Sequence, residues 1–421
     1  MAQFGRDERA EGGHMQGGTV RRTTAGRARA RLAAALVAVV TAGSAGATVL
    51  SGIAVASTET ATLPSDDPAN FTPNVLNGEV DSIWQVGSRV IIGGNFTSIA
   101  NASQNGGATF ARQRVAAFDA ATGIVDTGFA PNVNNTVRAV VPSADPASVY
   151  IAGPFTSVNG TTRSRVARVT LSNGQLVTQF NAGSINGQIR DMRLVDGVLY
   201  VAGDFSTVNG VARSRLAALD ATTGAVLPSL NLPFAGTHNG GGTNIFKIEV
   251  TPDGDRMLAI GNFTSVAGQS RTQIAMIELG TNPATLSTWD TTFYTSTCAS
   301  VFNTYMRDLD ISADGRYAVV STTGAYRPPP SACDTISRFE IDTDGPGQTP
   351  TWATYTGGDT SYAVEIHDGV VYVGGHMRWV NNPFGSDAPG AGAIPRDGIV
   401  ALDVVNGLPF SWNPGRARGV G

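Results

Sequence analysis

The sequence predicts an all-β fold built from a unit of about 56 residues that repeats along the chain. The 421-residue chain contains 51 glycines and 42% apolar residues but only 7% aromatic residues. Such a composition is typical of many short strands joined by tight turns. The apolar residues follow no helical period. Three motifs also recur in a fixed order, and each marks one part of the unit.

The first motif is an apolar strand that ends in glycine and is closely followed by an aromatic residue. Two clear copies are Val90-Ile91-Ile92-Gly93-Gly94-Asn95-Phe96 and Leu199-Tyr200-Val201-Ala202-Gly203-Asp204-Phe205. Counted from the glycine at position 94, the equivalent positions are 153, 203, 261, 324 and 375, and the last two copies are the most altered. The spacing predicts a central strand in each of six units.

The other two motifs complete the unit. Val115-Ala116-Ala117-Phe118-Asp119 and Leu216-Ala217-Ala218-Leu219-Asp220 are strands with an acidic end ahead of a Thr-Gly turn. An aromatic residue then closes the unit, as in Phe129-Ala130-Pro131 and Trp412-Asn413-Pro414. Each unit is therefore predicted to contain four short strands.

A four-stranded sheet of this size cannot bury both faces alone, whereas sheets packed around an axis cover one another. The sequence thus predicts a β-propeller of about six four-stranded blades. We expect Phe71-Thr72-Pro73 to end a blade whose other strands come from the C-terminal region, which would close the ring. Residues 415–421 are similar to the start of another unit, so seven blades in a longer parent chain and an open solenoid stay as alternatives.

The repeats resemble a known family. The pattern Gly-x-Phe-Thr-Ser-Val-Asn-Gly, then Arg-x-Arg, Leu-Asp-x-x-Thr-Gly and Phe-x-Pro, is similar to the delta-60 type repeat of bacterial secreted β-propellers, a family of unknown biochemical function. The resemblance covers residues 70–421 and is weakest in the fifth and sixth units. It implies a cell-surface or adhesion setting and supplies no catalytic residues.

The N-terminal region differs from the repeats. A basic stretch with five arginines between positions 21 and 31 precedes an apolar run over residues 32–55 and the small-residue site Ala54-Val55-Ala56. This order predicts a signal peptide cleaved after Ala56, with a retained membrane anchor as the alternative. The expected organisation is a polar N-terminus with a signal or anchor over residues 1–56, a linker over 57–69 and the propeller over 70–421.

Charge and cysteine content agree with export. Beyond residue 56 the chain has 22 basic and 30 acidic residues, a balance that argues against nucleic-acid binding, because phosphate groups need Lys and Arg. The two cysteines, Cys298 and Cys333, are expected to form a disulfide in an oxidising compartment. No metal site, cofactor or catalytic residue is predicted.

Residues that recur at the blade period are expected to be structural. Asp119, Asp220 and Asp403 precede turns and should accept turn N–H groups. Arginines that follow the aromatic motif should bond to a loop of the neighbouring blade, although a ring of them could also bind an anionic ligand. They are Arg112, Arg114, Arg163, Arg165, Arg213, Arg215 and Arg271.

Irregular loops are the better candidates for a binding site, because repeat proteins place their variable residues in loops on one face. The disulfide would clamp two such loops, residues 293–305 and 326–334. Two histidines flank a predicted strand in the sixth unit. The candidate ligand-binding residues are Tyr294, Phe302, Tyr305, Tyr326, His367 and His376.

These observations predict a secreted propeller that acts as an extracellular binding or scaffold module. The expected partner is an extracellular glycan or protein, and a membrane only if the apolar segment is retained. The alternative is a glycan hydrolase or lyase with its site at the mouth of the central channel, where carboxylates from several blades would converge.

Overall fold

The computed structural model describes residues 63–415. The predicted signal or anchor over 1–56, most of the linker and the C-terminal unit start at 416–421 lie outside the described residues. The described chain consists of strands and two short 3₁₀ turns, η1 (Ser103–Asn105) and η2 (Phe293–Thr295), without an α-helix. The all-β prediction is therefore confirmed. Among these residues, no helix has the length and apolar character needed to cross a membrane.

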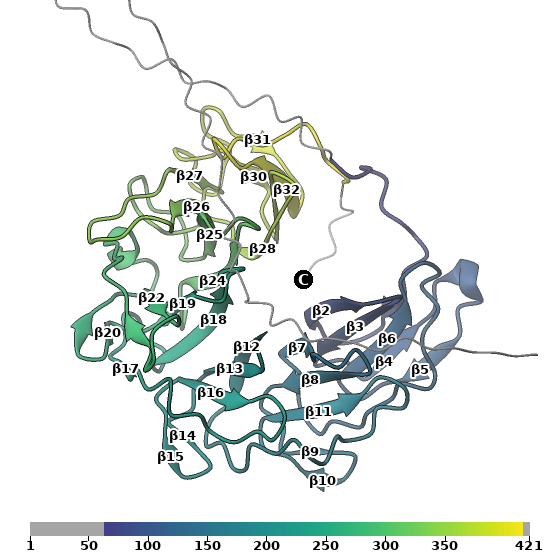
Figure 1. Cartoon of the computed structure of the whole chain (residues 1–421). Helices are drawn as coiled ribbons and strands as arrows, with labels where there is room; N and C mark the ends of the chain where they lie inside the picture. The colour runs from purple at the N-terminus through teal and green to yellow at the C-terminus, as the bar shows by residue number, and fades with distance from the viewer. Residues whose placement is uncertain (1–62, 416–421) are drawn as a thin grey trace, which may run out of the picture. The chain divides into compact units, whose positions relative to one another are not determined.

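The described strands between residues 80 and 403 form six antiparallel sheets around an open centre, one sheet for each repeat unit (Figure 1). In every sheet the first strand lies nearest the centre, and we number the sheets as blades 1 to 6 in chain order. The three inner strands of the blades are β2 (Val80–Val86), β3 (Arg89–Gly94) and β6 (Val115–Asp119); β7 (Ala139–Pro142), β8 (Ser148–Ala152) and β11 (Val166–Thr170); β12 (Ile189–Val195), β13 (Val198–Gly203) and β16 (Leu216–Asp220); β18 (Asn244–Val250), β19 (Arg256–Asn262) and β22 (Ile274–Glu278); β24 (Met306–Ile311), β25 (Tyr317–Thr322) and β26 (Thr335–Glu340); and β28 (Ser361–His367), β29 (Val370–Gly375) and β32 (Ile399–Asp403).

The fourth, outer strand is shorter than predicted in most blades. Blade 4 has β23 (Thr285–Leu286) and blade 5 has β27 (Trp352–Tyr355) in this position. In the other four blades the chain makes a single bridge to the third strand before it leaves for the next unit. The bridges are Phe118 to Val125, Val169 to Leu176, Leu219 to Val226, and Leu402 to Pro409.

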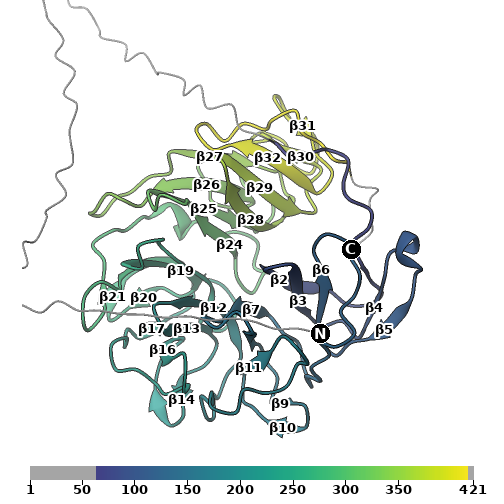
Figure 2. The ribbon, with the colours of Figure 1, turned by 45° about the vertical axis from the view of Figure 1, so that its right-hand side comes forward.

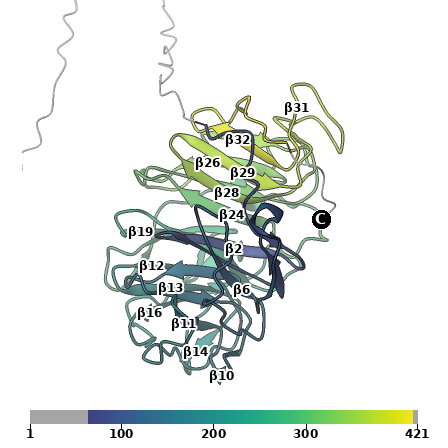
Figure 3. The same cartoon turned by 90° about the vertical axis from the view of Figure 1, so that its right-hand side faces the viewer.

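Short hairpins lie at the outer rim, as Figure 1 shows for β9–β10 and β14–β15; β10 and β14 lie at the same edge in Figures 2 and 3. In blades 2, 3 and 4 they form where the aromatic motif is followed by a tight Asn-Gly or Ala-Gly turn. The hairpin strands, together with β1 and β17 that pair with them, are β1 (Asn74–Val75), β4 (Ser98–Ala100) and β5 (Thr109–Ala111); β9 (Ser157–Val158) and β10 (Thr161–Thr162); β14 (Thr207–Val208) and β15 (Val211–Ala212); β17 (Phe234–Ala235), β20 (Ser265–Val266) and β21 (Gln269–Ser270); and β30 (Trp379–Val380) and β31 (Ile394–Pro395).

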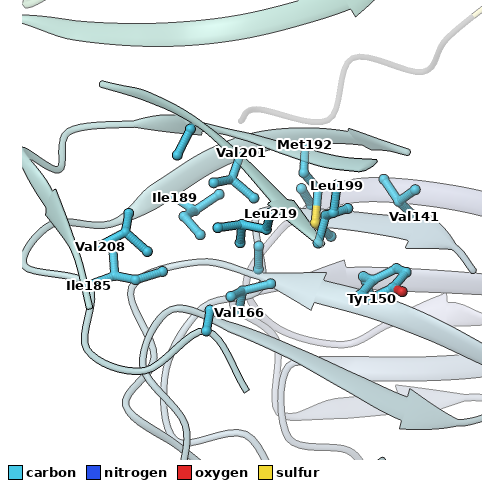
Figure 4. Packing of buried hydrophobic residues seen from close by; sticks show 14 of the residues in the cluster. Val141, Tyr150, Val166, Ile185, Ile189, Met192, Leu199, Val201, Val208 and Leu219 are labelled. Carbon is cyan, nitrogen blue, oxygen red and sulfur yellow. The ribbon is translucent and has the colours of Figure 1, made fainter. Parts of the chain in front are cut away.

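The core lies between neighbouring blades, and each interface combines side chains from two sheets. Between blades 2 and 3, Val141 and Tyr150 pack with Met192, Leu199 and Val201 (Figure 4). Each of these side chains is at most 4% exposed. Full burial of a Leu or Met side chain contributes about 1.5–3 kcal/mol, so a blade depends on its neighbours for most of its stability.

The recurring aspartates and arginines have the structural roles that repetition suggests. Asp220 Oδ1 accepts the N–H groups of Thr222 at 3.1 Å and Thr223 at 2.7 Å, and hydrogen bonds from Thr223 lower the pKa of its carboxyl. Arg213 donates to the carbonyls of Ala212 at 2.8 Å and Leu227 at 3.1 Å. Both carbonyls belong to its own blade, not to the neighbouring blade as predicted, because the outer strand of the same sheet passes beside the hairpin.

The N-terminal segment does not close the ring as predicted. In the described residues, Asn74–Val75 pairs with β4, which belongs to the rim hairpin of blade 1, and blade 6 consists of β28, β29 and β32. The indole Nε1 of Trp412 donates to the carbonyl of Ser65 at 3.3 Å. Inner strands lie against one another in sequence from β2 to β28, but no comparable packing joins β28 to β2, and Figure 1 shows an interval there.

Candidate functional site

A β-bulge interrupts the inner strand of five blades near its start. The register shifts between Val80 and Ser82 in β2, and equivalent shifts occur in β12, β18, β24 and β28. A bulge leaves one residue out of the ladder and re-aims its side chain. Arg138 holds the same position in blade 2, immediately before β7. Each blade therefore offers one irregularly placed side chain at the same height around the centre.

These six side chains line a single cavity of about 1120 Å³ at one end of the central channel. We call them the bulge ring. Unlike the apolar residues beside them, they differ in chemistry from blade to blade, which is typical of a binding surface on a repeated scaffold. The bulge ring consists of Asp81, Arg138, Arg190, Phe246, Arg307 and Tyr362.

Two arginines of the bulge ring are held by carboxylates. Arg138 Nη1 lies 3.5 Å from Asp81 Oδ2 across the boundary between blades 1 and 2. Arg190 makes two hydrogen bonds to Asp204, at 2.6 and 3.1 Å. These guanidinium groups are therefore largely neutralised by neighbours in the protein.

Arg307 is different, because no carboxylate of the described chain forms an ion pair with it. Its Nη1 donates a long hydrogen bond, 3.4 Å, to the carbonyl of Met306, and its buried Nε has no acceptor. Burial lowers the pKa of this guanidinium, against the opposing influence of Tyr362 and of the Asp334 carboxylate, and the nearby Arg190 also lowers it. A half-buried cation with no carboxylate at ion-pair distance is costly unless a ligand supplies a counter-charge.

Aromatic rings fix the position of Arg307. Its guanidinium lies 5.8 Å from the ring centre of Phe246 and 6.0 Å from that of Phe302. Arg190 lies 5.4 Å from the same Phe246 ring. Phe246 is thus flanked by two guanidinium groups within cation–π distance, which restrains both at the cavity wall.

A second aromatic group lies in blade 6. Tyr362 of the bulge ring is half exposed, and its ring centre lies 5.5 Å from that of His376, which follows β29. Both residues line the cavity. Arg378, also in the wall, is held by two carboxylates, Asp359 at 2.8 Å and Asp387 at 2.7 Å.

Deeper in the channel, side chains of one inner strand bond to the backbone of the next. Ser82 Oγ accepts the Val140 N–H at 3.0 Å, and Asp308 Oδ2 accepts the Val364 N–H at 3.0 Å. Asp310 accepts the N–H of Ile366 at 2.6 Å. Burial raises the pKa of the Asp310 carboxyl to about 7. These channel carboxylates connect blades, a role that accounts for them without catalysis.

The structure separates the six candidate residues predicted from the sequence. His376 lines the cavity. Phe302 lies against Arg307, which is in the cavity wall. Tyr326 is half-buried, with its hydroxyl 3.4 Å from the Pro383 carbonyl.

The other three candidates lie elsewhere. Tyr294 is buried between blades 4 and 5, where its hydroxyl bonds to Ser337 Oγ at 2.7 Å. Tyr305 is buried beside the disulfide. His367 is exposed at the far end of β28, next to Asp368.

The predicted disulfide between Cys298 and Cys333 is confirmed, with a Cα–Cα distance of 5.8 Å. It joins the two irregular loops as expected. Tyr305 packs on it, and Phe302 contacts the same cluster. The bond therefore fixes the loop that supplies one of the two rings under Arg307.

All six members of the bulge ring escaped the sequence analysis, which looked for variation only in loops. A signal was present in the repeats. One polar or aromatic residue recurs directly after a mostly apolar position at the start of each inner strand, as in Val137-Arg138 and Ile245-Phe246. Aligning the units on this position would have placed one residue per blade at the channel mouth.

Among residues 63–415, no group of three or more His, Cys, Asp or Glu side chains is placed to hold a metal ion. The cavity instead presents guanidinium groups and aromatic rings. Such a surface can bind a ligand that carries both flat apolar faces and negative charge.

Comparisons with known proteins agree with the architecture. A family described as a domain of unknown function (DUF5122) beta-propeller matches residues 148–180 and 196–224, in blades 2 and 3. The β-propeller prediction is thus confirmed, and the matched family has no known function. No curated protein matches the sequence.

Three solved structures are similar to the chain. Hydrazine synthase of Kuenenia stuttgartiensis is 16% identical, with a TM-score of 0.43 over 76% of this chain and 78% of its own. The computationally designed Ika8 protein is 12% identical, with a TM-score of 0.44 over 81% and 90%. The WD40 beta propeller domain of Doa1 is 11% identical, with a TM-score of 0.41 over 72% and 78%.

Proposed function

We propose that this protein is a secreted binding module that holds an acidic glycan at the bulge ring. The single observation that carries the proposal is Arg307, a half-buried guanidinium with no carboxylate at ion-pair distance in the described chain, held against Phe246 at the wall of a large cavity. A uronate or sulfate group on the ligand would supply the missing negative charge.

The rest of the cavity suits a sugar chain. Tyr362 is exposed at the cavity wall and offers an aromatic ring for stacking, while Phe246 restrains the two guanidinium groups beside it. Paired groups such as Arg138–Asp81 provide hydrogen-bond donors and acceptors for hydroxyl groups. The repeats' similarity to those of secreted propellers supports an extracellular setting.

The test is isothermal titration of the chain from residue 57 onward with oligogalacturonate and with a neutral cello-oligosaccharide of equal length. We expect the charged oligosaccharide to bind at least tenfold more tightly. The variant Arg307→Gln keeps part of the side chain over Phe246 but removes the charge. It should weaken oligogalacturonate binding about 10- to 100-fold, because hydrogen bonds to charged groups contribute about 1.5–3 kcal/mol.

Arg316→Gln is the matched control. Arg316 lies in the turn after β24, at the opposite end of that strand from Arg307, and its guanidinium is 67% exposed and paired with Asp342. This variant should bind like the wild type. Binding of neither oligosaccharide, or equal loss in both variants, would contradict the proposal. A preference for acidic peptides over both oligosaccharides would replace the glycan with a protein partner.

A further inference from the structure

One face of blade 1 is exposed where every other blade is covered. Val80 and Ile83 of β2 are 42% and 62% exposed. Ile189 and Met192, which hold the same two positions in blade 3, are fully buried. The equivalent residues of the remaining blades are at most 5% exposed: Val137 and Val140, Ile245 and Ile248, Met306 and Leu309, and Ser361 and Val364.

The apolar clusters show the same difference. In the interface before blade 2, Val140 and Ile151 of blade 2 pack with Ile91 and Ala117 of blade 1. The corresponding cluster on the open side of blade 1 contains residues of blade 1 and its rim hairpin only. Its members are Ile92, Phe96, Ile99, Ala116, Phe118 and Val125, with Val75, Val90 and Phe110 at its edge. This cluster is half of a blade interface.

The segments that join consecutive blades, which we call connectors, indicate which kind of sheet would cover this face. The backbone of each connector packs closely against the turn glycine of the blade that the connector reaches. A Cβ added at Gly174 would overlap Pro131, and one at Gly224 would overlap Ala182. A Cβ at Gly123 of blade 1 would likewise overlap the carbonyl of Phe71. Phe71-Thr72-Pro73 is therefore a connector that reaches blade 1 from a preceding blade.

Blade 6 has a connector of its own. Trp412-Asn413-Pro414 follows the outer bridge of that blade, as Phe129-Ala130-Pro131 follows the outer bridge of blade 1. A ring closed by six blades needs a single connector between blade 6 and blade 1. This chain has two, one leaving blade 6 and one arriving at blade 1, which is the number that a further blade between them would need.

We infer that the interval between blades 6 and 1 takes a seventh sheet of the same repeat, joined to the connector that leaves blade 6 at Pro414. Its far face would lie against blade 1, beside the connector that contains Phe71. The sheet would complete the half interface on blade 1, continuing the series of interfaces between the other blades. It would also add a seventh side chain to the bulge ring.

The test uses thiol labelling of Ile83→Cys, with Met192→Cys as the covered control. In the 421-residue chain, we expect the thiol at position 83 to react at least tenfold faster than that at 192. In a second protein, a copy of residues 183–232 replaces residues 415–421, so that a repeat follows the Trp412 connector. Labelling at position 83 should then slow at least tenfold.

Two further proteins guard against trivial results. A copy of residues 132–182 in the same place should also protect position 83 if the first appended repeat fails to fold. An appended repeat with Met192→Asp in the copy, which puts a charge on the face toward blade 6, should protect it less.

Three outcomes would overturn the inference. Slow labelling at position 83 in a monomeric 421-residue chain would mean that six blades close the ring. Protection that rises with protein concentration, with a doubled mass in light scattering, would make a second copy the occupant. Unchanged labelling in both folded, appended proteins would show that the interval does not take a repeat.

Discussion

The open face of blade 1 and the covered face of blade 3 are made by the same repeat. Ile83 and Met192 occupy equivalent positions in their inner strands, yet the first is 62% exposed and the second is fully buried. What differs is the neighbour, because blade 3 packs on blade 2 and blade 1 faces the interval beside blade 6. In this architecture a unit supplies half of each interface, and its contribution to stability depends on the sheet beside it.

The largest predicted effect comes from placing a charge on each of these faces. Met192→Asp buries a carboxylate without a partner and should cost at least about 3 kcal/mol of unfolding free energy. Ile83→Asp lies on an exposed face and should cost less than about 0.5 kcal/mol. Urea denaturation followed by tryptophan fluorescence would measure both. Equal costs would mean that the two faces are equally covered.

A smaller effect is expected at the interface between blades 5 and 6, where Asp310 occupies the position that Trp84 has in blade 1. Burial, together with the nearby Glu365 and Glu249, raises the pKa of the Asp310 carboxyl to about 7, against the hydrogen bond from Ile366. In the unfolded chain an aspartate ionises near pH 3.9. The stability that this carboxyl contributes is therefore complete below about pH 4 and is lost as the pH rises through 7.

The variant Asp310→Asn stays neutral and should escape this loss. Its unfolding free energy relative to the wild type should increase by about 1–3 kcal/mol between pH 5 and pH 8. Urea titrations at several pH values would show it. A difference that does not change with pH would contradict the raised pKa and leave Asp310 with hydrogen bonding alone.

The sequence predicted the fold well because the repeat encodes local structure. The Asp-x-x-Thr-Gly turns, the alternating apolar strands and the glycines after them depend on contacts within a few residues, such as those of Asp220 with Thr222 and Thr223. Ring closure was predicted wrongly. Whether Phe71 meets blade 6 or another sheet depends on packing between units far apart in the chain, which the repeat pattern does not encode.

The candidate site was less predictable for a related reason. The sequence favoured aromatic residues in irregular loops as ligand-binding residues. Tyr294 is instead buried in the core and Tyr305 in the cluster around the disulfide. Arg307 and Phe246 lie within strands, where a sequence pattern suggests burial. The bulges turn the side chains of Arg307 and Phe246 toward the channel, and the arrangement of the blades around the centre brings them together.

The most direct test of the central claim is amide hydrogen exchange of β2 and β12 in the same sample of the 421-residue chain. If the interval beside blade 1 is open, amides of β2 should exchange at least about tenfold faster than those of β12, because no preceding blade covers them. Equal protection of the two strands would contradict the account.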